Sequence, residues 1–192
     1  MAVVIATVEP SPQLHRFTRA RYEKMVDAGI FDEDDRIELL DGEIVEMAPQ
    51  KSRHATAVSL LNRCMADCFG RGFDVRVQWP LALGPHSEPE PYIAVVRGSP
   101  RDYRDAHPQH AELIVEVADA TLAYDRGRKL AAYARAGIAD YWILDLAAST
   151  LEVCRAPQGG EYADRQTLRA GDSIAPLSVR SASAIGVSDL LP

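Results

Sequence analysis

The chain has 192 residues, of which 47% are hydrophobic, and its formal net charge at pH 7 is −7. This length and apolar content suit a globular domain with a sizeable core, and no apolar run approaches the roughly 20 residues needed to span a bilayer. The acidic balance argues against nonspecific binding of nucleic acid over the whole surface, so any phosphate-binding face has to be local.

The start of the chain and its cysteines favour a cytoplasmic protein. The first residues, MAVVIATVEPSPQ, carry neither a basic region nor a cleavage-like site, so a secretory signal is not expected. Three cysteines are too few for a disulfide framework and fit a reducing compartment. We expect a single domain over residues 1–192, in which residues 1–14 form a loosely packed N-terminal segment.

Helical and strand patterns alternate in the first half of the chain. Thr18 is placed to cap a helix that ends near Ala28, before Gly29. Two β-prone segments around Asp41-Gly42 predict a hairpin, RIELL followed by EIVEM. Apolar residues at helical spacing then predict an amphipathic helix over residues 52–69.

Strands dominate the rest of the chain. Strand-like alternation appears in FDVRVQWPLAL, which Pro80 interrupts, and a short buried strand is predicted for YIAVVRG. The polar segment SPRDYRDAHPQHA indicates a loop with a helical turn. A strand–helix–strand unit is predicted over residues 112–146. A hairpin with a Gly159-Gly160 turn follows over residues 150–155 and 161–168.

One carboxylate lies in the middle of an apolar strand. Glu116 interrupts the run LIVEVA, where an unpaired charge is costly to bury unless a metal ion or another partner neutralises it. Lys129 lies in the first turns of the helix that follows. This combination favours metal-dependent phosphodiester chemistry, although a buried ion pair between the two residues, without a site role, stays open.

Several motifs occur in an order that resembles a known family. They are RIELLDGEIVEMAP, a helix begun by RH, PEPYIAVV, LIVEVAD and YDRGRKLAAYARAGIADYWILDL. Spread over residues 15–190, the set resembles the bacterial restriction-endonuclease-like proteins of the PD-(D/E)XK nuclease superfamily. The resemblance implies a mixed α/β (α+β) fold with a restriction-endonuclease-like core, in which helices flank a central twisted mixed sheet.

The resemblance also implies a site and a reaction. It implies hydrolysis of phosphodiester bonds in DNA with Mg²⁺ or Mn²⁺, which carboxylates hold and a lysine assists. It places the second metal-binding acid of the superfamily on Glu116. Ala118 occupies the usual lysine position, and the resemblance implies that in this family the lysine has moved to the following helix, at Lys129. The alternative for Lys129 is an ordinary surface lysine.

One position departs from the family pattern. The first acid is the aspartate of a Pro-Asp pair, but this chain has Pro91-Tyr92, and a phenol is neutral at physiological pH. Glu90 is a candidate replacement metal ligand. Glu38 matches a recurrent glutamate of the family and is a candidate auxiliary acid. The hypothesis is therefore an impaired or inactive site on an intact nuclease scaffold.

His54 matches a position at which the family tends to have histidine. It would orient a substrate phosphate or act as an accessory base, and a locally hydrogen-bonded histidine is equally compatible with the sequence. Two functions stay open: a metal-dependent endonuclease, and a catalytically inactive module that binds nucleic acid or a protein partner. DNA is the expected partner, a homodimer is compatible with fold analogy, and no membrane association is expected.

Overall fold

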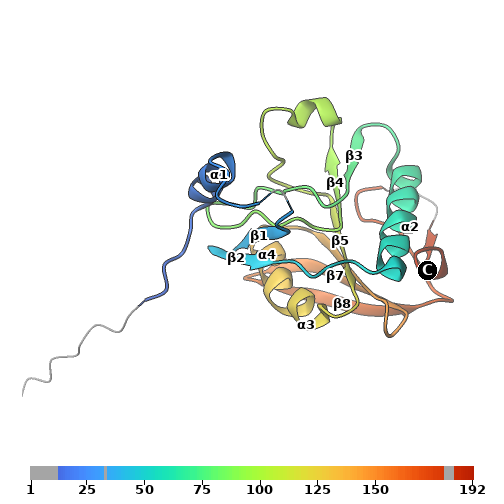
Figure 1. Cartoon of the computed structure of the whole chain (residues 1–192). Helices are drawn as coiled ribbons and strands as arrows, with labels where there is room; N and C mark the ends of the chain where they lie inside the picture. Colours follow the sequence, from blue (N-terminus) through green and yellow to red (C-terminus); the bar gives the residue numbers. More distant parts are fainter. Residues whose placement is uncertain (1–12, 33, 180–183) are drawn as a thin grey trace, which may run out of the picture.

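The computed structural model describes residues 13–32, 34–179 and 184–192 (Figure 1). Its helices are α1 (Arg19–Asp27), α2 (Ser52–Phe69), α3 (Leu122–Tyr124) and α4 (Leu130–Arg135), with a π-helix, η2 (Asp125–Lys129), and the 3₁₀ turns η1 (Pro100–Tyr103) and η3 (Val187–Asp189). Its strands are β1 (Ile37–Leu40), β2 (Glu43–Glu46), β3 (Phe73–Arg76), β4 (Ile93–Arg97), β5 (Leu113–Ala118), β6 (Asp140–Asp145), β7 (Thr150–Gln158), β8 (Glu161–Arg169), β9 (Ser173–Ile174) and β10 (Ile185–Gly186).

Six strands form a central mixed sheet in the order β3-β4-β5-β6-β7-β8. Neighbouring strands are antiparallel except β5 and β6, which are parallel. This exception follows from the connection, because the chain crosses from β5 to β6 through α3, η2 and α4, whereas a short turn joins β7 to β8. The expected mixed α/β architecture is thus the observed one.

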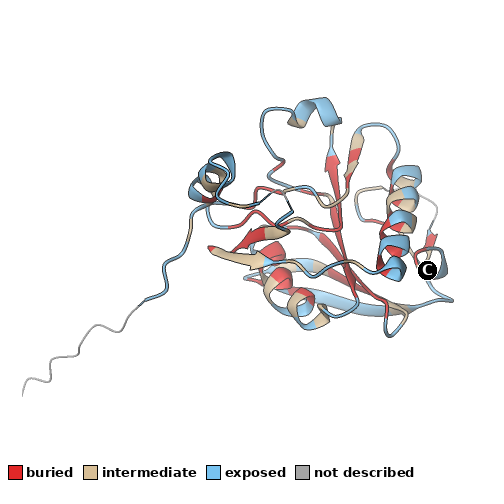
Figure 2. Ribbon diagram, in the orientation of Figure 1, coloured by how far each residue is buried: buried red, intermediate tan, exposed pale blue. Residues whose placement is uncertain are grey.

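The two faces of the sheet carry separate cores. Val115 and Val117 of β5 pack in the core with the apolar residues of α2, and Ile114 and Ala118 of the same strand pack in the core with those of α4. Successive side chains of a strand point to opposite faces of the sheet, and in β5 and β6 both faces are buried. This explains the continuous apolar runs of these two strands (Figure 2).

The β1–β2 hairpin lies outside the central sheet, near the strands that carry the site (Figure 1). Asp41 and Gly42 have positive φ, as a two-residue hairpin turn requires. Leu39 and Glu88 exchange two backbone hydrogen bonds, which fix β1 against the loop that leads into β4. This arrangement brings Glu38, the residue before Leu39, toward the end of the sheet at which β4 begins.

Most of the predicted elements are present. The helix predicted over 52–69 has these bounds, and both predicted hairpins form. The strand predicted from Phe73 is shorter than its alternating pattern, because Gln78 has a positive φ and the chain turns away from the sheet before Pro80. Most of the N-terminal segment lies outside the described residues. None of the helices described is long and apolar enough to cross a membrane.

Candidate active site

Glu116 projects from the middle of the sheet toward the helical crossover. It lies between Ile114 and Ala118 on the face of β5 that packs against α4. Its side chain is fully buried and accepts hydrogen bonds at Oε1 from Lys129 Nζ at 3.0 Å and from the Tyr133 hydroxyl at 2.7 Å. The acid that the sequence places in the strand and the amine that it places on the next helix therefore meet.

Lys129 reaches this position from a π-helical turn. Leu130 N–H donates to the carbonyl of Asp125, five residues earlier, so the segment Asp125–Lys129 is wider than an α-helix. Both of its end residues are buried. Single π turns of this kind occur frequently at functional sites because they reorient side chains relative to the flanking helix. The sequence predicts a helix here but not its widened turn.

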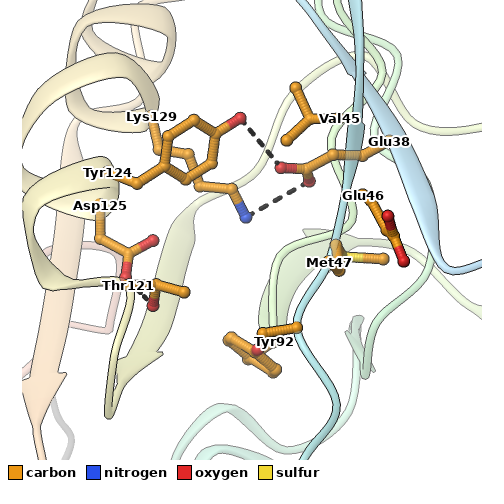
Figure 3. A pocket seen from close by; sticks show the side chains of 10 residues that line it. Glu38, Val45, Glu46, Met47, Tyr92, Thr121, Tyr124, Asp125 and Lys129 are labelled. Atoms are coloured by element: carbon orange, nitrogen blue, oxygen red, sulfur yellow. Dashed lines mark hydrogen bonds and ion pairs between the residues drawn. The ribbon is translucent and has the colours of Figure 1, made fainter.

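Glu38 brings a second carboxylate to Lys129 from the hairpin. Lys129 Nζ lies 3.3 Å from Glu38 Oε2, which also accepts a hydrogen bond from the backbone N–H of Glu90 at 3.0 Å. The Tyr124 hydroxyl donates to Glu38 Oε1 at 3.4 Å (Figure 3). The ammonium group thus lies between two carboxylates that come from β1 and β5, elements far apart in the sequence.

A cavity of about 170 Å³ opens beside this ion pair. Glu38, Lys129, Asp125 and Thr121 line it together with Tyr92 and Tyr124, and the hairpin residues 45–48 close its other side (Figure 3). Glu116 does not line the cavity itself, but it binds Lys129, which does. The Thr121 hydroxyl donates to Asp125 at 2.7 Å, which holds this third carboxylate in place.

Burial and mutual repulsion perturb the ionisable groups around the cavity. Burial, with the charge of Glu116 beside it, raises the pKa of Asp125 to about 7. Burial also raises the pKa of Glu116, although Lys129 opposes that shift. Burial works against the charge of Lys129, but Glu116 and Glu38 outweigh it and raise the pKa of the ammonium group. The site holds more carboxylates than its one buried lysine can neutralise.

Tyr92 and Glu90 contact the cluster through their backbone N–H groups. Tyr92 is buried at the start of β4, and its N–H donates to Glu116 Oε2 at 3.4 Å. Burial and Glu116 raise the pKa of its phenol to about 12, so the side chain is neutral. The contact of Glu90 with the site is its backbone N–H to Glu38, and burial and Glu38 raise the pKa of its own carboxyl to about 7.

His54 lies near the cavity but lines a different one. Its ring packs edge-on against Tyr92, with 4.4 Å between ring centroids, and it faces a neighbouring hollow at the start of α2. Burial lowers the pKa of its imidazole. The structure therefore separates His54 from the three-residue cluster of Glu38, Glu116 and Lys129, with the Tyr92 ring between them.

Comparison with known proteins now bears on this arrangement. A family model, Uma2, described as "Putative restriction endonuclease", matches residues 19–187. The chain belongs to this family. A crystal structure described as "a putative nuclease belonging to DUF820", from Anabaena variabilis, superposes with a TM-score of 0.71 at 15% sequence identity, covering 91% of this chain and 97% of that one. At this identity the likeness shows a shared fold. No match was found among curated proteins.

The Uma2 match confirms the family that the motifs suggest, and the solved structure confirms the fold. Two tyrosines that bind the carboxylates were not among the predicted site residues. Tyr133 lies four residues after Lys129, and Tyr124 lies five before it. Helical spacing from Lys129 is the signal that could have indicated Tyr133. Tyr124 ends α3, immediately before the π turn, which the sequence does not reveal.

Three arginines on the strands and helices around the site do not line the cavity of this Uma2 protein. Arg97 ends β4, at the opposite end of the strand from Tyr92, and pairs with Glu112. Arg126 pairs with Glu152, and Arg128 pairs with Glu43 on the hairpin. These side chains are engaged in ion pairs rather than directed into the cavity.

The donors around the cavity suit a hard divalent cation in their chemistry. Glu38 and Asp125 present carboxylate oxygens, which Mg²⁺ and Mn²⁺ prefer, and the ammonium group of Lys129 already compensates part of the charge of Glu38. Tyr92, at the position where the resemblance implies an acid, is neutral. Among the residues described, no three His, Cys, Asp or Glu side chains are grouped closely enough to hold a metal ion. The carboxylates that line the cavity have the chemistry that such a cation needs, but they are fewer and less closely grouped than the resemblance implies.

Proposed function

We propose that this chain is a divalent-cation-dependent nuclease that hydrolyses phosphodiester bonds in DNA, with an activity weakened by Tyr92. The observation that supports the proposal most strongly is the position of the Lys129 ammonium group, between Glu116 and Glu38 and at the wall of a cavity. Membership of a restriction-endonuclease family and the nuclease-like fold support the choice of substrate class.

Each residue of the cluster has a distinct role in this proposal. Lys129 attracts a substrate phosphate and stabilises the negative charge that develops on it during hydrolysis. Glu116 positions Lys129 by accepting its hydrogen bond, and the Tyr133 hydroxyl in turn orients Glu116 by donating to it. Glu38 and Asp125 would hold Mg²⁺ or Mn²⁺ at the cavity. When bound, this cation lowers the pKa of water and offsets phosphate charge.

Glu90 stays a weaker candidate ligand. Its carboxyl does not line the cavity, whereas those of Glu38 and Asp125 do. Its backbone N–H, by contrast, orients Glu38. A Glu90→Gln variant that keeps its Mn²⁺ affinity would support this assignment, and a large loss of affinity would return Glu90 to the ligand set.

A cleavage assay tests the proposal. Plasmid DNA incubated with Mn²⁺ should be nicked slowly by the wild type and not by Glu116→Gln, whereas Glu112→Gln should nick at the wild-type rate. Glu112 is the matched control because it lies just before β5 and pairs with Arg97, away from the cavity. Absence of cleavage over a range of metals and DNA forms would reject the proposed activity.

Metal titration tests the role of Tyr92. Restoring the family's acid in Tyr92→Asp should tighten Mn²⁺ binding, because it adds an anionic oxygen donor to the cavity. In Tyr92→Asn the new side chain has nearly the same shape as the aspartate of Tyr92→Asp but no charge. Comparing the two variants therefore separates the effect of the charge from the effect of removing the ring. Equal affinity in the wild type and Tyr92→Asp would show that the missing acid is not what limits the site.

A non-catalytic module that binds nucleic acid or a protein partner is the second candidate. The neutral Tyr92 ring favours it, since this buried side chain fills space where the family pattern has an acid. Binding of DNA that is unchanged by Mn²⁺ and by Glu116→Gln, without any cleavage, would favour this function over the nuclease.

A further inference from the structure

A second cavity, of about 340 Å³, lies beside the first. Lys51 and His54, at the start of α2, form one side of it, and Asp119 and Thr121, after β5, form the other. Tyr92 and Thr121 line both cavities, together with Ala48, so the two hollows are neighbours that share a wall. The nuclease proposal assigns no role to this second cavity.

The start of α2 is suited to an anion. This helix has 18 residues, Lys51 is its N-cap residue, and among the described side chains none caps it. Its first turn contains Ser52, Arg53 and His54 and no acidic residue. Unpaired N–H groups and the helix dipole therefore present positive potential, to which the Lys51 ammonium group adds.

His54 provides an independent observation that points to a ligand. The residue is only 6% exposed, and its Nε2 atom has no hydrogen-bond partner within the described part of the chain. A buried polar atom without a partner is costly, and such atoms are usually satisfied by protein, water or a ligand. His54 lines the cavity, so a group bound there is placed to supply the missing partner.

Asp119 does not close the cavity to anions. It pairs with Lys51 at 3.7 Å, and both side chains are substantially exposed to solvent. Exposed pairs of this kind contribute little to stability, so an incoming anion can replace Asp119 as the partner of Lys51 at small cost.

We propose that the cavity at the start of α2 binds a phosphate group, held by Lys51, His54 and the backbone N–H groups of the first turn. Anion binding by this cavity stands on its own geometry. The identity of the natural ligand rests on the proposed nuclease function. That ligand is the DNA backbone phosphate adjacent to the one at Lys129, and the Tyr92 ring lies between the two phosphates. Two neighbouring phosphate sites fix the register of a strand in the site.

Titration of inorganic phosphate, followed by NMR of the histidine ring nitrogens, tests the proposal. The chain has five histidines, and His54→Gln identifies the resonance of interest by removing it. The His54 resonance should move with phosphate and saturate, and it should not move with chloride at the same ionic strength. Lys51→Ala should weaken the apparent affinity about tenfold, as expected for loss of one charge-assisted contact.

Lys24→Ala is the matched control, since Lys24 is an exposed lysine in the last turn of α1. It should leave the affinity unchanged. A His54 resonance that does not respond to phosphate would overturn the proposal. An equal loss in Lys51→Ala and Lys24→Ala would also overturn it, because nonspecific charge would then explain the response.

Glu116→Gln separates this proposal from the nuclease function. Phosphate binding should persist in that variant, since Glu116 lies behind Lys129 and not at this cavity. Saturable binding at His54 in a protein that cleaves no DNA would support the anion site and reject the nuclease. Cleavage that depends on Glu116, without phosphate binding at His54, would reject the anion site and leave the nuclease proposal in place.

Discussion

Replacing Lys129 with methionine tests the electrostatic reasoning about the buried cluster. The substitution keeps an unbranched side chain of similar length but removes the one positive charge that lies between Glu116 and Glu38. Removing one partner of a buried ion pair typically costs about 3–5 kcal/mol, because the other charge stays buried without compensation. Here Tyr133 and the Tyr92 N–H still donate to Glu116, so a loss near 3 kcal/mol is expected at pH 8.

The size of this loss should depend on pH. The pKa of Glu116 is already raised in the folded protein, and it should rise further when Lys129 is absent. When the pKa of a carboxyl is higher in the folded protein than in the unfolded one, the free energy of unfolding falls as pH rises above the unfolded pKa, near 4.5. At pH 5 the folded variant can take up a proton at Glu116, so its deficit should be smaller than at pH 8.

Urea unfolding of the wild type and Lys129→Met at pH 5 and pH 8 measures both quantities. Arg104→Met is the control, because Arg104 and Asp105 form a highly exposed pair whose loss should hardly change stability. The double variant with Glu116→Gln should recover part of the deficit, since no buried charge is then left unpaired. A deficit below about 1 kcal/mol, or the same deficit at both pH values, would refute the argument for a buried, charge-compensated cluster.

Three further predictions concern other parts of the fold. Burial, with Glu23 nearby, raises the pKa of Glu88 to about 7, so Glu88→Gln should stabilise the protein at pH 8 and have little effect at pH 4.5; urea unfolding at both values would show it, and a pH-independent effect would contradict it. Leu61→Ala in α2 should cost about 2–5 kcal/mol in the free energy of unfolding because Leu61 is fully buried in the core, and a cost below 1 kcal/mol would contradict that packing. Gly42→Ala should lower the melting temperature more than Gly29→Ala, although both positions have positive φ. A Cβ at Gly42 would lie 2.7 Å from the Cβ of Arg16, whereas a Cβ at Gly29 would meet open space. Equal shifts in melting temperature would contradict this account.

Local patterns predicted the elements well where one pattern dominates. The apolar spacing of residues 52–69 defines α2 because its apolar stripe faces one core, and Asp41-Gly42 defines a hairpin because both residues tolerate positive φ. The pattern failed after Arg76, where alternation continues but the strand does not. Pairing ends there because the chain bends at Gln78, and alternation alone does not carry that information.

The surroundings of Tyr92 illustrate what a motif leaves open. The sequence shows that the residue is not an acid, and the physical chemistry of a phenol shows that it is neutral. Only the packed structure shows that its ring contacts His54 and forms a wall shared by two cavities. That placement depends on α2 and β4, which are separated by many residues in the chain.

The amino-acid sequence by itself determined the family, the alternation that turns Glu116 toward the helical face, and the need for a partner to that buried charge. These follow from residue order, side-chain direction and the cost of desolvation, which are local properties. Tertiary structure alone decided that Lys129 has two carboxylate partners, that the second comes from the hairpin, and that a π turn carries the lysine to them. Such contacts form only when distant segments pack together, because the free energy that selects them belongs to the whole fold.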